Sequence, residues 1–382
     1  MDLALTREQE LLRRNVREFA TREIAPGARE RDRNAEWPGE LFRRMGDMGL
    51  LGFFVPPEYG GTGPDAVGYA IAMEEVSHAC ASLGVLMSIH NSLLCDSLVR
   101  FGSDAQRREH LPALAVGKRV GCFSLTEPAS GSDASTMDTV ARRDGDAWVI
   151  DGSKNFATGG GHADIALVFA MTTRGIGHRG VSAFLVPTAT PGFVRGANDD
   201  KVGIRAAHSC SLFFEGCRVP DASRLGDEGG GFKIAMSALD GGRIGIAAQA
   251  LGIARAAYEK ALAYARERRA FGSALADKQA IQIKLADMAT DIDAARLLVH
   301  RAAWMKDHKQ RHTRESAMAK LFASETASRV THAAVQIFGG IGYTRECDAE
   351  RHWRDARVTE IYEGTSEILR LVIAAQALKE IA

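Results

Sequence analysis

The chain has 382 residues, which is enough for two or three domains that each bury a core. Its 48 Lys and Arg residues balance 48 Asp and Glu residues, so the formal net charge is zero. A nucleic-acid partner would call for a strong basic excess, and a membrane-spanning helix would need about 18 consecutive apolar residues. The sequence has neither, so we expect no nucleic-acid and no membrane partner.

Residues 1–120 are predicted to form an N-terminal α-helical domain. Thr6 and Gln9 have the spacing of a capping box, which marks the start of a first helix. Charged residues interrupt any apolar stretch near the N-terminus, so it is not typical of a signal peptide, and its acidic residues are not typical of a transit peptide. We therefore expect a cytoplasmic location, or the mitochondrial matrix only if a transit peptide was removed.

Residues 121–230 have the pattern of a middle antiparallel β domain, in which Gly, Asp, Thr and Pro clusters separate short apolar runs. The sequence GIGHRG at 175–180 matches the G-x-G-x-x-G dinucleotide motif, but a strand-like run follows it instead of a helix. Without a helix N-terminus to hold a pyrophosphate, a glycine-rich hairpin loop is the better interpretation. The predicted strands include 148–150, 165–170, 181–186 and 211–214.

Residues 231–382 return to a helical pattern. Leu251, Ala254 and Tyr258 fall on one face at helical spacing. Long Ala-rich helices of this kind are typical of a four-helix bundle. The sequence therefore predicts an α+β fold: an N-terminal helical domain, a middle antiparallel β domain and a C-terminal four-helix bundle.

Neither the cysteines nor the histidines indicate a metal site. The six cysteines show no C-x-x-C spacing, and we expect reduced, mostly buried thiols. His308 and His312 lie at i and i+4, but no carboxylate or cysteine completes a ligand set in this polar, basic stretch. A solvated helix end is the favoured interpretation of this pair.

Residues 361–370, IYEGTSEILR, place one carboxylate, Glu363, between an aromatic ring and a glycine. The Gly-Thr step interrupts the helical pattern, and the hydroxyls of Thr365 and Ser366 can cap the helix that follows. An acid with apolar neighbours at such a break is partly desolvated, which raises its pKa toward the value that a general base needs. An ordinary glutamate in a helix-to-helix turn is the alternative, and this segment alone favours it.

The rest of the chain reverses that preference, because five motifs in the right order resemble those of the acyl-CoA dehydrogenase family. The resemblance covers essentially the whole chain and is greatest to the short-chain, or butyryl-CoA, branch. The helical, β and helical order is also the fold of this family. The motifs are CFSLTEPASGSD (122–133), DGSKNFATGG (151–160), ALDGGRIGIAAQALG (238–252), ERRAFG (267–272) with QIFGG (336–340), and IYEGTSEILR (361–370).

The resemblance implies FAD as the cofactor. Leu125 and Thr126 would contact the flavin ring system, and Thr158 would bond near flavin N5 and O4. Phe156 stands where relatives usually carry tryptophan, so a smaller ring would cover one flavin face. Further contacts from the C-terminal bundle would come from Thr365 and Glu367.

The fourth motif group implies a homo-oligomer. Its residues would reach the FAD of a neighbouring subunit, where Arg268 would pair with the pyrophosphate in the bidentate geometry that suits guanidinium. The active site would then need at least a dimer, and relatives suggest a tetramer. The residues assigned to this contact are Arg268, Phe271, Gln279, Gln336 and Gly340.

The resemblance also assigns residues to an acyl-CoA thioester. Ser132 would contact the CoA portion, and Asp240 would contact the pantetheine arm. Tyr362 and Gly364 would border the thioester, and Arg243 would lie close to the catalytic acid and moderate its pKa.

Glu363 is then the expected catalytic base. Some branches of the family place the base immediately before the arginine, where this chain has Gly242. Glu363 is therefore the remaining candidate, and an isovaleryl-type enzyme is disfavoured. The residues at 82–86 include no arginine for a distal carboxylate, so a neutral acyl chain is expected instead of a glutaryl group.

The implied reaction is α,β-dehydrogenation of a short straight or branched acyl-CoA to the trans-2-enoyl-CoA. Glu363 would remove the α-proton, the β-hydrogen would leave as hydride to flavin N5, and an electron-transfer flavoprotein would accept the electrons. Two alternatives remain open at this point: a flavin-dependent oxidase on the same fold, and a catalytically silent flavoprotein subunit.

Overall fold

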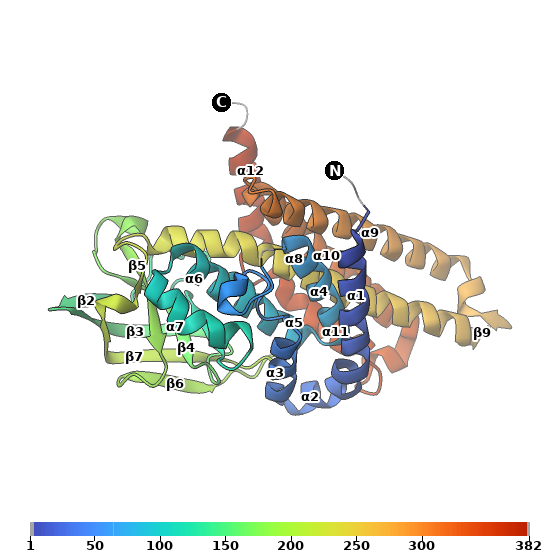
Figure 1. The fold of residues 1–382 in the computed structure, drawn as a ribbon. Helices are drawn as coiled ribbons and strands as arrows, with labels where there is room; N and C mark the ends of the chain where they lie inside the picture. The colour runs from blue at the N-terminus through green and yellow to red at the C-terminus, as the bar shows by residue number, and fades with distance from the viewer. Residues whose placement is uncertain (1–3, 64, 380–382) are drawn as a thin grey trace.

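The computed structural model describes residues 4–63 and 65–379, so the outer ends of the predicted segments 1–120 and 231–382 lie outside the described residues. A helical segment, a β-sheet and a second helical segment follow one another along the chain, which confirms the predicted fold class (Figure 1). The sheet lies at one end of the molecule, and the long C-terminal helices run away from it toward the other end.

The described residues of the N-terminal segment form seven α-helices. The first helix begins where the sequence predicts, with the expected capping box. The Thr6 hydroxyl accepts a hydrogen bond from the Gln9 backbone (3.2 Å), and the Gln9 side chain accepts one from the Thr6 backbone (3.1 Å). A π-helical turn, Ile89–Cys95, joins the fifth and sixth helices. The helices are α1 (Arg7–Phe19), α2 (Ala28–Asn34), α3 (Gly39–Asp47), α4 (Ala66–Ala79), α5 (Ala81–Ser88), α6 (Asp96–Phe101) and α7 (Asp104–Ala115).

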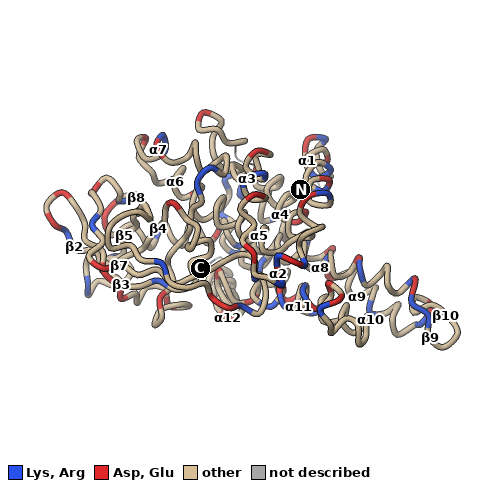
Figure 2. The backbone as a smooth tube through the Cα atoms, turned by 90° about the horizontal axis from the view of Figure 1, so that it is seen from below, with Lys and Arg blue, Asp and Glu red and all other residues tan. Residues whose placement is uncertain are grey.

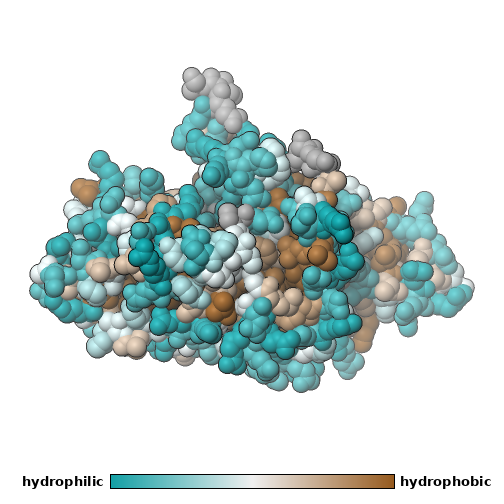
Figure 3. Space-filling view, viewed as in Figure 1, coloured by the Kyte–Doolittle hydropathy of each residue, from teal (hydrophilic) through white to brown (hydrophobic). Residues whose placement is uncertain are grey.

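The run Ala81–Phe101 is long and apolar enough to cross a membrane, with a mean hydropathy of 1.2. Its most apolar stretch is 94% buried inside the structure, however, as expected of a core helix of a folded domain. Charges of both signs are interspersed along the chain (Figure 2). The face seen in Figure 3 is mainly hydrophilic, with apolar residues gathered near its centre.

The middle segment forms a sheet with the order β6-β7-β3-β2-β4-β5-β8, and β1 pairs with β4. The runs predicted from the sequence lie within β3, β4, β5 and β7. GIGHRG lies in the connection between the antiparallel strands β4 and β5, which confirms the hairpin interpretation. The strands are β1 (Gly121–Ser124), β2 (Val140–Asp144), β3 (Ala147–Thr158), β4 (Ile165–Met171), β5 (Val181–Pro187), β6 (Phe193–Asn198), β7 (Ser209–Pro220) and β8 (Arg224–Leu225).

The sheet is not wholly antiparallel, which corrects the prediction. Strand β1 runs parallel to β4, and β2 meets β4 in a parallel pair, Val140 with Met171. Parallel neighbours need a long crossover connection, and residues 125–164 supply one between β1 and β4. This connection contains β2, β3 and the loop 125–139 that leads from β1 to β2. That loop contains Leu125, Thr126 and Ser132.

Strand β4 is buried along its whole length because both faces of the sheet are covered. Leu167 and Phe169 pack in one core with α6 and α7, whereas Val168 and Ala170 pack on the other face with Trp148. This alternation follows from the two-residue period of a strand. A third core joins the N-terminal helices to the C-terminal ones.

Up to residue 379, the C-terminal segment contains three long α-helices and two shorter ones. Helix α8 packs against α4 of the N-terminal segment and against α9 and α10, while α11 and α12 pack against α10. A small hairpin at the far end joins α8 to α9. The elements are α8 (Gly231–Glu267), β9 (Arg269–Ala270), β10 (Ser273–Ala274), α9 (Gln279–Asp307), α10 (Thr313–Phe338), α11 (Ala349–Arg357) and α12 (Ser366–Lys379).

Candidate active site

Glu363 lies in a sharp turn between α11 and α12. Its backbone is left-handed (φ 53°), and Gly364 follows with φ 104°. A side chain in the left-handed region is uncommon and is retained only where its surroundings impose it. The predicted break in the helix is present, and the Ile368 backbone donates to the Thr365 hydroxyl (3.3 Å), so Thr365 caps α12. Ser366, the other predicted cap, is instead the first residue of the helix.

The carboxyl group of Glu363 is poorly solvated. Its Oε2 is inaccessible to solvent and finds no hydrogen-bond partner among the described residues. Burial raises the pKa of Glu363 to about 8, and the positive charges of Lys320 and Arg243 act in the opposite direction. Unpaired buried carboxyl groups shift in this way because the charged form loses its hydration. The group therefore has the proton affinity that a general base near neutral pH requires.

Two cations hold the turn through its carbonyl groups. The Lys320 ammonium on α10 donates to the Gly364 carbonyl (2.7 Å), and Arg243 on α8 lies 3.4 Å from the Glu363 carbonyl. Arg243 also pairs with Asp240 (2.7 Å), whose second oxygen accepts from Thr313 (2.7 Å). Arg243 thus contacts the backbone of Glu363, and its charge lowers the pKa of the Glu363 carboxyl.

The neighbouring turn of α8 makes room for the carboxylate. A Cβ atom at Gly242 would lie 2.1 Å from Glu363 Oε2 and 2.8 Å from a methyl group of Leu93. Real Cβ atoms essentially never lie within 3.0 Å of such a group, so any side chain at position 242 would displace one of these groups. The glycine is therefore a condition for the observed position of Glu363.

Tyr362 is fixed by a hydrogen bond that the sequence did not indicate. Its hydroxyl donates to the Gln249 side-chain oxygen, and the Gln249 amide donates to the Ala81 carbonyl (2.8 Å). Burial raises the pKa of the Tyr362 phenol well above its ordinary value, and the charge of Glu363 adds to this effect. The tyrosine thus stays neutral beside Glu363.

Two segments assigned to the flavin lie side by side in the β domain. The Asn155 backbone donates to the Thr126 carbonyl (2.8 Å), which joins the loop after β1 to the end of β3. Lys154 is fully buried and donates to the Leu125 carbonyl (3.1 Å) and to Glu127 (2.6 Å). Phe156 has a left-handed backbone (φ 57°) and is 66% exposed.

The structure does not bring all the predicted residues together. A second group lies at the end of the molecule opposite the sheet, near the β9–β10 hairpin (Figure 1). There the rings of Tyr264 and Phe338 stack with centroids 4.4 Å apart, and Phe271 is 98% exposed. This group comprises Arg268, Phe271, Gln279, Gln336 and Gly340.

The remaining predicted residues lie on the surface or in structural pairs. Ser132 is exposed in the loop before β2, and Glu367 is exposed in the first turn of α12. His308 contacts the Trp304 carbonyl (2.8 Å), and His312 contacts the Ser316 hydroxyl (2.9 Å). Within residues 4–63 and 65–379, no group of three or more potential metal ligands comes together. All six cysteines are free thiols.

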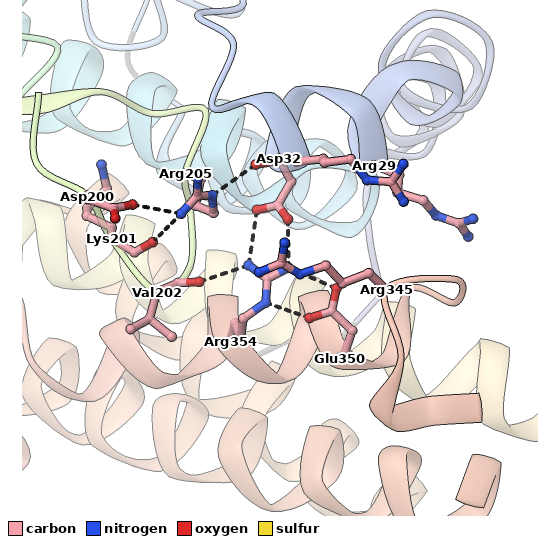
Figure 4. A pocket seen from close by; sticks show the side chains of 10 residues that line it. Arg29, Asp32, Asp200, Lys201, Val202, Arg205, Arg345, Glu350 and Arg354 are labelled. Carbon is pink, nitrogen blue, oxygen red and sulfur yellow. Dashed lines mark hydrogen bonds and ion pairs between the residues drawn. The ribbon is translucent and has the colours of Figure 1, made fainter. Parts of the chain in front are cut away.

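A cavity of about 300 Å³ lies away from Glu363, where the three segments of the chain meet (Figure 4). Arg354 of α11 is at its centre and pairs with Asp32 of α2 (2.6 Å) and Glu350 (2.6 Å). It also donates to the Val202 carbonyl (2.8 Å), while Arg205 donates to the Asp32 carbonyl (3.1 Å). The Arg354–Asp32 ion pair and the two hydrogen bonds to carbonyl groups thus join the three segments at this cavity.

Comparison with known proteins identifies the family. The acyl-CoA dehydrogenase N-terminal, middle and C-terminal domains match residues 6–118, 122–217 and 229–378. A short-chain specific acyl-CoA dehydrogenase of Bos taurus, named as mitochondrial, is 51% identical over 375 residues, which cover 98% of this chain and 91% of the relative. The chain therefore belongs to the acyl-CoA dehydrogenase family.

Solved structures agree with this assignment. The butyryl-CoA dehydrogenase of Megasphaera elsdenii has a TM-score of 0.97 and 43% identity, with 99% of this chain and 100% of that chain covered. A structure described as the electron transferring flavoprotein of Acidaminococcus fermentans matches with a TM-score of 0.98 and 45% identity, covering 99% and 100%. The protein is an FAD-dependent oxidoreductase that acts on the CH–CH group of an acyl-CoA.

The β-domain segments fit the flavin of such an enzyme. The exposed Phe156 ring offers an apolar face, and Thr158 follows it two residues along β3. Thr126 is brought near by the hydrogen bond between its carbonyl and the Asn155 backbone (2.8 Å). The buried Lys154–Glu127 pair fixes both segments, so this surface is built before any ligand arrives. A planar heterocycle with a polar edge suits such a surface.

Proposed function

We propose that this enzyme dehydrogenates short-chain acyl-CoA thioesters and that Glu363 is the base that removes the α-proton. The observation that carries the proposal is the solvent-shielded, unpartnered Oε2 of Glu363, with its raised pKa. The bovine relative is named short-chain specific and the Megasphaera relative is a butyryl-CoA dehydrogenase, and both names support a short acyl chain. Short straight and short branched chains are both included.

Bound FAD supplies the hydride acceptor. The chain's own task is to orient the thioester, to exclude water and to hold the α-proton once it is removed. Glu363 takes this proton on its shielded carboxylate. Its backbone N–H, turned by the left-handed conformation, would donate to the thioester oxygen; such donors contribute about 2.7–4 kcal/mol to stabilising a developing oxyanion.

The neutral character of the acyl chain agrees with the helix that carries residues 82–86. All five residues from Ser82 to Leu86 are buried in α5, and none of them is charged. A distal carboxylate in this region would therefore lose its hydration without gaining a cation. The thioester itself would lie beside Tyr362 and Gly364, with Asp240 and Ser132 farther along the CoA arm.

A second copy of the chain would complete the cofactor site. The group around Arg268 lies far from the β-domain group that includes Leu125, so a single chain cannot place both on one FAD (Figure 1). A homo-oligomer, with the tetramer as the proposed size, resolves this separation. The relative described as an electron transferring flavoprotein supports an electron-transfer flavoprotein as the electron acceptor, and a cytoplasmic location remains our proposal.

The decisive test is an anaerobic titration of the flavin with butyryl-, isobutyryl-, isovaleryl-, octanoyl- and glutaryl-CoA. We expect one of the two four-carbon substrates to bleach the flavin most efficiently, and Glu363→Gln to abolish bleaching while FAD stays bound. Glu325→Gln is the matched control, because Glu325 pairs with Arg370 on the surface (2.6 Å). Bleaching of Glu363→Gln at the wild-type rate would refute the assignment of the base. If the reduced flavin reacts with oxygen as fast as the enzyme turns over acyl-CoA in the steady state, the result would favour an oxidase.

A further inference from the structure

Lys320 is a buried lysine on α10 without a carboxylate partner. Its side chain is completely buried, and its ammonium group donates to the Gly364 carbonyl (2.7 Å). Two other shielded lysines are neutralised by a carboxylate: the buried Lys154 pairs with Glu127 (2.6 Å), and the partly buried Lys306 pairs with Asp96 (2.9 Å). Among the described residues, no carboxylate oxygen comes within ion-pair distance of Lys320. An uncompensated buried charge is costly, so its retention calls for a function.

The charged groups around Lys320 centre on Glu363. Glu363 is the strongest attractive charge that acts on the lysine, followed by Glu360 and Glu367, and Arg243 opposes them. Lys320 in turn contributes more than Arg243 to stabilising ionised Glu363. From α4, the buried Tyr69 also faces this carboxylate, but it is neutral because burial raises its pKa.

We propose that Lys320 is a positioning residue for Glu363: it holds the left-handed turn through the Gly364 carbonyl and supplies the uncompensated positive charge that stabilises the ionised base. The inference rests on the proposed function of Glu363. Arg243 is less able to do this, because its guanidinium already pairs with Asp240 and its nearest contact with Glu363 is the backbone carbonyl.

The two groups are matched in proton affinity. Burial lowers the pKa of Lys320 to about 8, and burial raises the pKa of Glu363 to about 8. The positive charge of Lys320 lowers the pKa of Glu363, so removal of this charge should raise that pKa further. Each further unit lowers the ionised fraction of Glu363 at pH 7 about tenfold.

The test compares Lys320→Met, Lys320→Gln and Lys320→Arg by anaerobic stopped-flow reduction of the flavin with butyryl-CoA across pH 6–10. Methionine removes the charge and the donor, glutamine keeps a donor without charge, and arginine keeps both. We expect the acid limb of the rate profile to move to higher pH in the Met and Gln variants, with a loss of at least about tenfold at pH 7. The Arg variant should retain the wild-type limb.

A second measurement follows the carboxyl group without turnover. The infrared band of the protonated Glu363 carboxyl is identified by its absence in Glu363→Gln. This band is then titrated with pH in wild type and in Lys320→Gln, and its midpoint should lie at higher pH in Lys320→Gln. FAD content and unfolding temperature show that each variant is folded. Lys260→Met, which removes a surface pair with Asp348 (2.8 Å), is the control with an unchanged profile.

If folded Lys320→Gln has the same acid limb and infrared midpoint as wild type, the inference about Lys320 is wrong. If Glu363→Gln is inactive in the same experiments, the proposed function of Glu363 still stands. An active Glu363→Gln, in contrast, would reject the base itself. If Lys320→Met fails to fold, the Gln variant decides between the two outcomes, because it keeps a donor for the Gly364 carbonyl.

Discussion

At the residue scale, the position of Glu363 depends on features of two helices, α8 and α10. Its left-handed backbone is held by Lys320 of α10 and Arg243 of α8, and its carboxylate occupies space that Gly242 leaves free. The Glu363 Oε2 atom is shielded from solvent, and no described residue donates a hydrogen bond to it. The proton affinity of Glu363 is thus a consequence of packing, and small changes of packing should alter it.

Gly242→Ala should displace the base. A methyl group at this position would lie 2.1 Å from Glu363 Oε2, so the carboxylate must move. Displacement of a reacting group by about 1 Å can cost on the order of 10²-fold in rate, and we expect such a fall in flavin reduction by butyryl-CoA. Stability should not fall in parallel, because alanine is the better helix former by about 1 kcal/mol.

The adjacent Gly241→Ala is the matched control for this change. A Cβ atom there would lie 3.0 Å from the flexible end of Lys306, which can move aside. We expect the reduction rate of this variant to stay near that of wild type. Equal rates in the two variants would show that space at Gly242 does not control the position of Glu363.

At the scale of elements, the loop after β1 and the end of β3 behave as one unit. Lys154 joins them by donating to Leu125 and Glu127, and Glu127 also accepts from the Thr139 backbone (3.1 Å). Burial lowers the pKa of Lys154 to about 8, and the charge of Glu127 opposes that shift. The surface formed by these two segments therefore depends on a buried ion pair.

Lys154→Met should weaken FAD binding and destabilise the fold. The change leaves Glu127 as an unpaired buried charge, which typically costs about 3–5 kcal/mol. Urea unfolding of the apoprotein and the FAD dissociation constant measure the two effects separately. The double variant Glu127→Gln with Lys154→Met removes the stranded charge and should recover part of both losses. Tight FAD binding in the single variant would show that the pair does not order these segments.

Much of the element structure could be predicted from local pattern, and the failures have physical causes. Alternating or continuous apolar runs indicated β3, β4, β5 and β7, whose side chains are buried on one or both faces. Strand β6 is largely exposed and short, so it gives little hydrophobic signal. The parallel pairing of β1 with β4 depends on the crossover connection formed by residues 125–164, and no local sequence pattern indicates which strands such a connection brings together.

The same distinction applies to the site. The turn at Glu363 has a local signal, a glycine and a capping threonine, which indicated the break in the helix. The segment alone favoured an ordinary glutamate, and only the family resemblance singled out Glu363 as the base. Lys320 and Gln249 have no such signal, because a lone lysine or glutamine in a helix is usually solvated. Only the packing of α10, α8 and the turn shows that both are buried and bonded to the site.

At the scale of the whole molecule, the sheet is held against the helices by a polar junction as well as by apolar cores. Arg354 links α11 to α2 and to the Val202 loop, and Asp355 beside it accepts from the Ile204 backbone (2.5 Å). Burial raises the pKa of Asp355 to about 6. The chain after α11 leads directly to the Glu363 turn, so this junction fixes the approach of that turn to the other segments.

Arg354→Leu should destabilise the whole fold by about 3–5 kcal/mol, because it leaves Asp32 and Glu350 mostly buried without their cation. Leucine fills part of the volume but cannot donate to the Val202 carbonyl. Arg345→Leu is the matched control: Arg345 lines the same cavity, is exposed, and is expected to change stability by less than about 0.5 kcal/mol. Urea unfolding followed by circular dichroism compares the two. Equal midpoints would mean that the apolar cores alone join the segments, whereas a selective loss in Arg354→Leu would show that the ion-pair junction holds the three segments together.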